Sequence, residues 1–258
     1  MRADVFLVAN GYVSSRQTAK RLIEQGNAMV DGRTIRKPSE EIGEGEHSVE
    51  IQDPLRYVGR GGLKLEGALD AFGIDPAGKT AADIGASTGG FTDCLLQRGA
   101  THVFAVDSGE GQLAEKLLRD ARVTSMERCN ARYLTWEQLG ERVDLIVMDV
   151  SFISATYLLP RFHELLKPNG AAVCLVKPQF EVGRSLVGKG GVVKDRRAHR
   201  LAVERVMTAA KDAGLTPVGL IPSPIEGGDG NREFLLSLRF GDAEEREFTL
   251  DQIPKITG

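Results

Sequence analysis

Cysteine is scarce in this sequence. Three cysteines, Cys94, Cys129 and Cys174, are spread over 258 residues, and no two of them form a C-x-x-C pair or a cluster with histidine. A set that is odd in number and widely spaced predicts neither a disulfide framework nor a zinc site. We therefore expect reduced thiols and no bound metal.

Long hydrophobic runs are missing too. The longest, such as 145–150 and 171–176, are about as long as a β-strand, whereas spanning a bilayer takes ~20 residues. The first twelve residues, MRADVFLVANGY, lack the basic-then-apolar order of a secretory signal. We expect a cytoplasmic protein with no membrane partner. A pore-forming or haemolytic protein is the main non-enzymatic alternative, and it lacks the membrane elements it would need.

An excess of positive charge is also absent. The formal net charge is -3, so any surface that binds nucleic acid must be local. Charge is uneven near the start: residues 1–38 hold seven Lys/Arg and three Asp/Glu, and residues 39–53 hold six acidic residues and no Lys or Arg. A hydrophobic content of 41% nevertheless supports a folded core, and 258 residues suit a small domain followed by a larger one.

The first part of the chain predicts a small α+β domain. An apolar helix comes first, and a second helix is predicted over 16–25, capped by Ser14 or Ser15. Asp31-Gly32 between two short apolar runs predicts a β-hairpin. Basic side chains here predict a phosphate-binding face, namely Arg2, Arg16, Lys20 and Arg21. The alternative is a solvated helix face whose charge is balanced by the acidic stretch that follows.

From Lys79 onward strands alternate with helices. Strands are predicted over 80–84, 102–106, 143–149, 171–177, 216–222 and 232–240, and helices over 90–98, 110–119, 155–166 and 196–213. This alternation predicts an α/β, Rossmann-like domain with a mostly parallel sheet between helices. Because no helix separates the last two strands, we expect an antiparallel edge strand at 232–240. The predicted parts are 1–58 for the small domain, 59–62 for a linker, 63–241 for the larger domain and 242–258 for a tail.

A glycine-rich turn after the first of these strands predicts a cofactor site. The segment is Ala81-Ala82-Asp83-Ile84-Gly85-Ala86-Ser87-Thr88-Gly89-Gly90-Phe91. Glycine permits close approach of a ligand to the backbone, and the following helix start offers free N–H groups. Asp107 ends the next strand 22 residues after Gly85, where a carboxylate accepts hydrogen bonds from ribose hydroxyls. The second glycine of the G-x-G-x-x-G pattern is missing and Asp83 would repel a pyrophosphate, so S-adenosylmethionine is favoured over a dinucleotide.

The same turn also matches the G-x-S-x-G nucleophile elbow of serine hydrolases. Ser87 is followed by Asp149 and His199 in the order of an α/β-hydrolase triad. That elbow normally comes after several strands, whereas here it follows the first, and this alternative leaves Asp107 without a role. We treat the serine hydrolase as a minor alternative.

Two charged residues end buried strands and are candidates for catalysis. Asp149 follows the apolar strand over 143–148, and Lys177 follows the strand over 171–176. Carboxyl ends of strands face the ligand crevice in open α/β sheets. A sugar hydroxyl is a poor nucleophile at neutral pH, and it needs a positioned base or a cation; lysine serves where its environment lowers its pKa. Either residue alone also fits a solvated charge at a strand end.

At this point the chain resembles the TlyA group of rRNA 2′-O-methyltransferases, often labelled hemolysin A, whose catalytic domain is FtsJ-like. The matching segments are 61–66 (GGLKLE), 83–92 (DIGASTGGFT), 149–154 (DVSFIS), 175–181 (LVKPQFE) and 230–234 (GNREF). The N-terminal domain resembles an RNA-binding domain shared with a small-subunit ribosomal protein. The resemblance implies an S-adenosylmethionine methyltransferase fold with a seven-stranded sheet.

The resemblance also implies functional residues. It places a catalytic tetrad at Lys64, Asp149, Lys177 and Glu233. It implies that the cofactor contacts Asp83, Gly85, Ala86, Ser87, Gly89, Phe91, Asp107, Ser108, Asn130, Ala131 and Asp149. Arg60, Arg184 and Lys189 join the expected RNA-binding residues. The expected partner is ribosomal RNA within ribosomal subunits, with the target nucleotide flipped out of its helix. An RNA-binding protein without activity is disfavoured by the intact tetrad.

Overall fold

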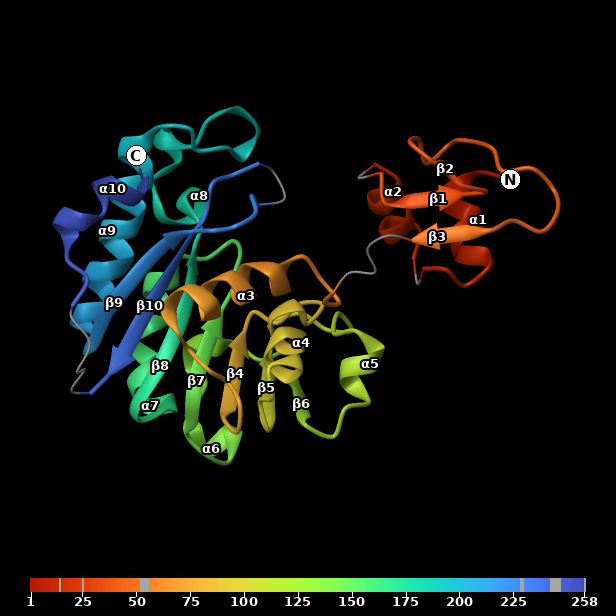
Figure 1. Cartoon of the computed structure of the whole chain (residues 1–258). Helices are drawn as coiled ribbons and strands as arrows, with labels where there is room; N and C mark the ends of the chain where they lie inside the picture. The colour runs from red at the N-terminus through yellow and green to blue at the C-terminus, as the bar shows by residue number, and fades with distance from the viewer. Residues whose placement is uncertain (14, 25, 52–55, 228–229, 242–246, 258) are drawn as a thin grey trace. The chain divides into compact units, whose positions relative to one another are not determined.

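The computed structural model describes residues 1–13, 15–24, 26–51, 56–227, 230–241 and 247–257. It divides the chain into two compact units, Met1–Arg56 and Tyr57–Gly258 (Figure 1). The division lies two residues before the expected boundary at 58. Gly61 and Gly62, expected in a linker, form the first turn of a helix of the second unit.

The first unit packs two helices on a small sheet. It contains α1 (Ala3–Ala9), α2 (Arg16–Glu24), β1 (Ala28–Val30), β2 (Arg33–Thr34) and β3 (Val49–Ile51). The sheet order is β2-β1-β3, and both pairings are antiparallel. Asp31 and Gly32 both have positive φ, as the tight hairpin between β1 and β2 requires. Ser15 Oγ accepts a hydrogen bond from Thr18 N–H and caps α2, while Ser14 and residue 25 lie outside the described residues.

The second unit is built on a seven-stranded sheet. Its strands are β4 (Thr80–Ile84), β5 (His102–Val106), β6 (Val123–Met126), β7 (Val143–Met148), β8 (Leu166–Val176), β9 (Leu215–Pro222) and β10 (Phe234–Phe240). Its α-helices are α3 (Gly61–Phe72), α4 (Gly90–Gln97), α5 (Glu115–Leu118), α6 (Trp136–Leu139), α7 (Leu159–Leu165), α8 (Pro178–Glu181), α9 (Arg196–Asp212) and α10 (Pro254–Thr257). Short 3-10 helices are η1 (Ala131–Tyr133), η2 (Ala155–Tyr157), η3 (Arg184–Leu186), η4 (Lys189–Gly191) and η5 (Leu250–Gln252).

The strand order is β6-β5-β4-β7-β8-β10-β9, and β10 alone runs antiparallel to its neighbours. The antiparallel strand is therefore the one predicted, but its predicted place at the edge is wrong. The crossover through α9 carries β9 to the edge, and the hairpin after β9 brings β10 back between β9 and β8. The mixed sheet and the small α+β unit agree with the predicted fold class.

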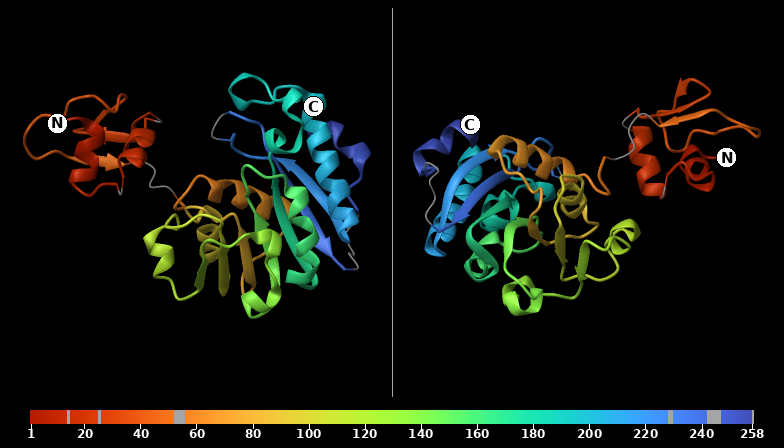
Figure 2. Two further views of the ribbon diagram at one scale, coloured as in Figure 1. Left: turned by 180° about the vertical axis from the view of Figure 1, so that it is seen from behind. Right: turned by 60° about the horizontal axis from the view of Figure 1, so that its bottom comes forward.

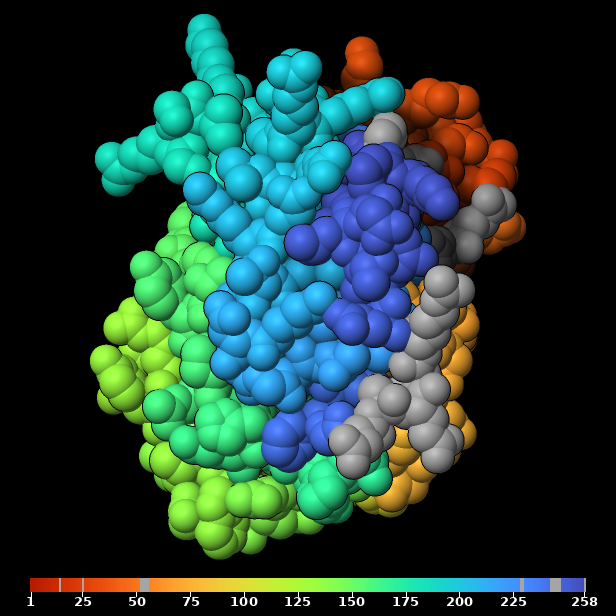
Figure 3. Space-filling view, turned by 90° about the vertical axis from the view of Figure 1, so that its left-hand side faces the viewer, coloured from red at the N-terminus to blue at the C-terminus, as the bar shows by residue number. Residues whose placement is uncertain are grey.

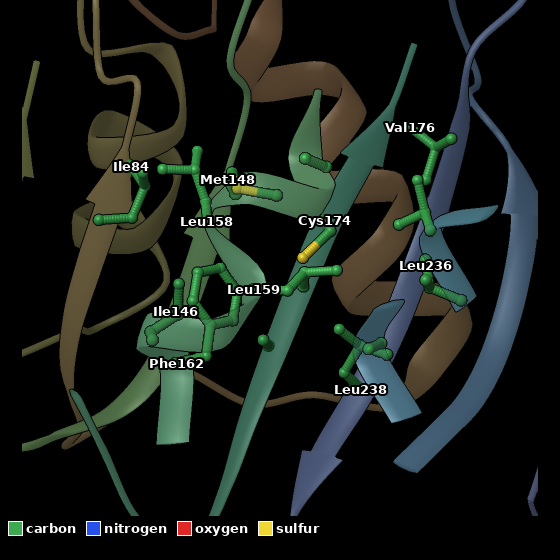
Figure 4. Packing of buried hydrophobic residues seen from close by; sticks show 14 of the residues in the cluster. Ile84, Ile146, Met148, Leu158, Leu159, Phe162, Cys174, Val176, Leu236 and Leu238 are labelled. Carbon is green, nitrogen blue, oxygen red and sulfur yellow. The ribbon is translucent and has the colours of Figure 1, made fainter. Parts of the chain in front are cut away.

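Helices cover both faces of this sheet (Figure 2). The alternation along β7 shows why: Leu145 and Val147 pack with α3 and α4, while Ile146 and Met148 pack with α7 and α9. Figure 4 shows the second of these cores, where Phe162 of α7 lies against side chains from β7 and β8. Burial on both faces explains why these strands read as continuous apolar runs.

Residues 247–257, the described part of the predicted tail, pack on the large domain. Ile253, between η5 and α10, is fully buried and belongs to the core on the α9 side. Figure 3 shows this segment lying over α9. Residues 242–246 and 258 of the predicted tail lie outside the described residues.

Candidate active site

The predicted catalytic residues meet at one edge of the large sheet. Strands β4, β7 and β8 are parallel, so the residues after them, from Gly85, Asp149 and Lys177 onward, gather at their carboxyl ends. Because Phe234 of β10 lies opposite Val176 of β8, the residue before it, Glu233, reaches the same edge. The tetrad thus draws on three strands and on α3.

Lys177 and Asp149 form an ion pair at this edge. Nζ of Lys177 lies 2.6 Å from Oδ1 of Asp149 and donates a hydrogen bond to Oγ of Ser151 at 2.8 Å. The two charged side chains are 11% and 21% exposed, so both are largely withdrawn from water yet still reachable. The sequence prediction did not single out Ser151, although it lies two residues after Asp149.

Lys64 and Glu233 form a second, more deeply buried pair. Nζ of Lys64 donates to Oε2 of Glu233 at 2.5 Å, and the side chains are 10% and 3% exposed. Gly227 makes room for this pair, because a Cβ there would lie 2.6 Å from Oε1 of Glu233. Removing one partner of so deeply buried a pair would leave an unpaired charge in the interior and destabilise the folded protein. The four predicted catalytic residues are thus organised as two lysine–carboxylate pairs.

The glycine-rich turn is shaped by close contacts. Gly85 has φ of 85°, and a Cβ on it would lie 2.5 Å from the carbonyl oxygen of Asp149. Gly89 has φ of 92°, and a Cβ on it would meet Leu117. Both positions therefore require glycine for conformation and for space. Ser87 also has a positive φ, of 47°, and its backbone N–H donates to the carboxylate of Asp107.

Asp83 has a buried carboxylate that can accept a further hydrogen bond. Its Oδ2 accepts hydrogen bonds from the backbone N–H and the hydroxyl of Thr92, at 2.9 and 2.7 Å. Its Oδ1 is buried and has no partner among the described residues. Burial raises the pKa of Asp83 to about 7, against the lowering effect of Thr92. An orphaned buried oxygen of this kind is completed by a ligand that donates to it.

Two hollows meet at these residues. The larger, about 570 Å³, is lined by predicted cofactor residues, namely Gly85, Ser87, Asp107, Ser108, Asn130, Ala131 and Asp149. The smaller, about 210 Å³, is lined by Asp83, Ala86, Phe91 and Lys177, among others, and it shares Gly85, Ser87 and Asp149 with the larger. The structure therefore gathers ten of the eleven predicted cofactor residues around the hollows; the eleventh, Gly89, shapes the turn.

Asp107 and Asn130 are already partly engaged. The Asp107 carboxylate accepts from the backbone N–H groups of Ser87 and Gly109, at 2.8 and 2.7 Å. Oδ1 of Asn130 accepts from the N–H of Arg132 and caps η1. A carboxylate has about four acceptor sites, so Asp107 retains capacity for ribose hydroxyls.

The residues of the hydrolase alternative do not form a triad. The hydroxyl of Ser87 donates to Gln112 at 3.1 Å. The imidazole of His199 is buried beside Phe234, and its Nε2 lies 2.8 Å from the carbonyl oxygen of Val193. The Asp149 carboxylate is paired with Lys177. Ser87 has the strained backbone of a nucleophile elbow, but these contacts supply no base to it.

The predicted RNA-binding residues have different environments. Arg2 and Arg16 each lie 2.9 Å from the buried carboxylate of Asp4, whose pKa they hold well below its usual range against the effect of burial. Lys20, Arg184 and Lys189 are exposed, and Arg21 is half-buried. Arg60 lines the smaller hollow and donates to the carbonyl of Glu226 at 3.0 Å.

Glu181 is a site residue that sequence reasoning passed over. Its carboxylate accepts from the hydroxyl of Ser154 at 2.5 Å and from the N–H of Ala155 at 2.8 Å. Burial raises the pKa of Glu181. Through these two hydrogen bonds, Glu181 connects α8, which follows Lys177, to the segment that follows Asp149. A signal existed, because both ends of this link lie in the matching segments 149–154 and 175–181.

No group of three or more histidine, cysteine, aspartate or glutamate side chains among the described residues is placed to hold a metal ion. No helix among them is long and apolar enough to cross a membrane.

Comparisons with known proteins identify the family of each unit. Residues 57–240 match the model of the FtsJ-like methyltransferases, and residues 1–48 match the S4 domain. The chain is 46% identical over 239 residues to "16S/23S rRNA (cytidine-2'-O)-methyltransferase TlyA" of Mycobacterium tuberculosis, covering 92% of this chain and 89% of the relative. It is 44% identical over 258 residues to "Putative rRNA methyltransferase YqxC" of Bacillus subtilis, covering 99% and 92%. Among solved structures, "Putative hemolysin from Streptococcus thermophilus" superposes with a TM-score of 0.79 at 41% identity, covering 100% of this chain and 94% of that one.

Proposed function

Because the chain belongs to the TlyA/hemolysin A family of FtsJ-like rRNA 2′-O-methyltransferases, we propose that it methylates the ribose 2′-hydroxyl of a cytidine in ribosomal RNA, using S-adenosylmethionine. The observation that carries the proposal is the Lys177–Asp149 pair, which lies at the junction of the two hollows. A methyl donor and a hydroxyl group that meet there would both lie beside Lys177.

The residues present suit S-adenosylmethionine. The free Oδ1 of Asp83 matches an ammonium group, and the remaining acceptor sites of Asp107 match ribose hydroxyls. Asn130 and Ala131 line the larger hollow, and the family resemblance implies that they contact the adenine. When bound, the cofactor supplies a methyl group on a positively charged sulfur. No metal ligand is needed for such a transfer.

The proposed work of Lys177 is to remove one proton. The ion pair must first release one proton to solvent; Nζ of Lys177 then accepts the proton of the 2′-hydroxyl as its oxygen attacks the methyl group, and Asp149 stabilises the ammonium that forms again. The hydrogen bond to Ser151 fixes the direction of Nζ. A positioned general base contributes typically 10²–10⁴-fold to rate, and orientation within the site contributes further.

The proposed work of Lys64 and Glu233 is structural and electrostatic. Their buried pair fixes α3 against the start of β10. Gly61, in the first turn of α3, is close enough to the site that a Cβ on it would lie 3.8 Å from Oδ2 of Asp149. The pair thus sets the position of the wall that faces Asp149.

Ribosomal RNA is the proposed substrate because the family of each unit is associated with RNA. The S4 domain is an RNA-binding module, and exposed basic residues such as Lys20 and Lys189 are available for phosphates. The curated relative that is 46% identical is named for cytidine in 16S and 23S rRNA. We therefore propose ribosomal subunits in the cytoplasm as the physiological partner, with the target cytidine flipped into the site.

Methyl transfer from labelled S-adenosylmethionine to isolated ribosomal subunits tests the proposal. We expect Lys177→Ala to lower kcat by about 10²–10⁴-fold and to leave binding of S-adenosylhomocysteine intact. Lys211→Ala is the matched control, since it removes a lysine from an ion pair with Glu247, and neither residue lines the two hollows. Incorporation at the 2′-oxygen is read by alkaline resistance of the modified linkage. A wild-type protein that binds the cofactor but labels neither subunit would remove the substrate assignment.

A further inference from the structure

An arginine lies between two exposed tyrosines beside the cofactor hollow. The guanidinium carbon of Arg132 is 5.7 Å from the ring centre of Tyr133 and 5.8 Å from that of Tyr157. Tyr133 belongs to η1 and Tyr157 to η2, so two separate segments supply the rings. We call Arg132, Tyr133 and Tyr157 the tyrosine–arginine cluster. The guanidinium lowers the pKa of the Tyr133 phenol, which agrees with their close contact.

Core packing does not account for this cluster. Tyr133 is 68% exposed and Tyr157 is 64% exposed, although most large apolar side chains of this unit are buried. Arg132 is exposed as well. Tyrosine and arginine are enriched among the residues that carry most of the binding energy at interfaces, so an exposed group of this composition suits a binding surface.

The cluster adjoins the cofactor hollow. Asn130 and Ala131, which line the cofactor hollow, immediately precede Arg132. Arg132 and Tyr157 line a neighbouring groove of about 1260 Å³. The cofactor hollow and this groove share Phe152 and Ile153 as a common wall. Phe152 is 92% exposed, so a strand whose target ribose lies at Lys177 would pass over it, outside the cofactor hollow, to reach this groove.

We propose that the tyrosine–arginine cluster binds an unpaired nucleobase of the RNA strand next to the methylated nucleotide. The inference rests on the proposed function, and it names how the strand beside the target is held. Tyrosine rings stack on bases of any sequence, and a guanidinium stacks on bases while donating to their edges or to phosphate. Single-stranded RNA beside a flipped nucleotide presents such bases.

Charge in the groove favours a base here over a run of phosphates. Arg132, Arg184 and Arg205 supply positive charge, but the acidic residues Glu181, Glu204 and Asp212 line the same groove. A groove of mixed charge gives little net attraction for the backbone. Recognition must then come mainly from the rings, which is why the proposal names a stacked base.

The test compares kinetic constants for ribosomal subunits and for the cofactor. We expect Tyr157→Ala and Arg132→Ala to raise KM for subunits about tenfold to hundredfold, the loss that corresponds to one stacked base. Binding of S-adenosylhomocysteine should be unchanged. Tyr157→Phe, which keeps the ring, should behave like wild type. Trp136→Ala, which removes a 40% exposed aromatic residue of α6, is the matched control and should also behave like wild type.

Ultraviolet cross-linking identifies what the cluster touches. We expect Tyr157 of the wild-type protein to cross-link to a nucleotide within one or two positions of the methylated ribose, and Tyr157→Ala to lose that cross-link. A cross-link to a ribosomal protein or to a distant helix would overturn the inference, as would wild-type KM in both alanine variants or weakened cofactor binding. If wild-type protein methylates neither subunit, the proposed function fails; if it methylates and the variants match it, only this inference fails.

Discussion

Phe234 lies opposite Val176 in antiparallel register, and this one pairing brings Glu233 to the edge of the sheet where Lys177 lies. A parallel strand at that place would present its carboxyl end there, and the residue before it would lie at the far edge. The reversed direction of β10 is therefore part of how the site is built. It also gives Lys64, on α3, a buried partner 2.5 Å away.

Breaking the Lys64–Glu233 pair should destabilise the catalytic domain. Lys64→Ala leaves the Glu233 carboxylate buried and unpaired, and the expected cost is about 3–5 kcal/mol of unfolding free energy. Lys64→Met combined with Glu233→Leu removes both charges and should recover most of that loss while activity stays low. Urea denaturation measures the first effect. A Lys64→Ala variant as stable as wild type would show that the pair is not the constraint described.

Substituting Gly85 should abolish cofactor binding. A Cβ at this position would lie 2.5 Å from the carbonyl oxygen of Asp149, so Gly85→Ala must displace the strand end that carries Asp149. Gly78→Ala is the control, since Gly78 has φ of 72° and open space around it. Both variants pay about 1–2 kcal/mol for the left-handed backbone, but only Gly85→Ala should lose binding of S-adenosylhomocysteine in calorimetry. Equal binding by both would contradict the close approach.

Cofactor affinity should depend on pH through Asp83. Its carboxyl has a pKa of about 7 in the folded protein, so it is protonated below that pH and must release a proton to receive an ammonium group. We expect the affinity for S-adenosylhomocysteine to fall up to tenfold for each pH unit below 7. Calorimetric titrations between pH 5.5 and 8.5, in buffers of different ionisation enthalpy, measure both the affinity and the proton released. A flat profile would remove Asp83 from the ammonium site.

The same carboxyl should make stability depend on pH in the opposite sense. Below the unfolded pKa of 3.8 both states hold the proton and nothing changes. Between 3.8 and about 7 the unfolded chain has lost the proton that the folded protein keeps, so stability without ligand falls as pH rises through this window. The melting temperature of Asp83→Asn relative to that of wild type should therefore be higher at pH 8 than at pH 5. A variant that is destabilised equally at both values would contradict this account.

Glu181 should support activity without touching the substrate. Glu181→Ala leaves the buried Ala155 N–H without its acceptor, at a cost of about 1–3 kcal/mol, and leaves the Ser154 hydroxyl with Thr156 alone. The loosened segment includes Ser151, so kcat should fall while KM for the cofactor changes little. Glu181→Gln keeps an acceptor for the N–H and should restore most of kcat. If Glu181→Gln is as impaired as Glu181→Ala, the charge itself matters and the positioning role is wrong.

Much of the fold could be predicted because local signals agreed with tertiary structure. Buried strands such as 143–148 read as apolar runs, and the Asp31-Gly32 hairpin has the backbone its sequence predicts. The misses have physical reasons. The strand β6, with the sequence VTSM at the sheet edge, is half-exposed and lacks an apolar run. The position of β10 depends on where the α9 crossover leaves a gap, which no local pattern records.

The site divides in the same way. Asp149 and Lys177 were recognisable from the residues alone because each ends a buried strand. Glu233 and Lys64 were named only through the family resemblance, since their burial follows from a contact across 169 residues of chain. Glu181 was missed because its partners lie 26 and 27 residues away and no periodicity marks them.

Ribose-methylation mapping of rRNA tests the central claim most directly. The gene is deleted and then replaced by wild type, by Lys177→Ala or by Lys211→Ala, and 2′-O-methylated positions are read across both ribosomal RNAs. We predict at least one cytidine whose methylation disappears on deletion, returns with wild type and Lys211→Ala, and does not return with Lys177→Ala. Identical maps in all four strains would contradict the account.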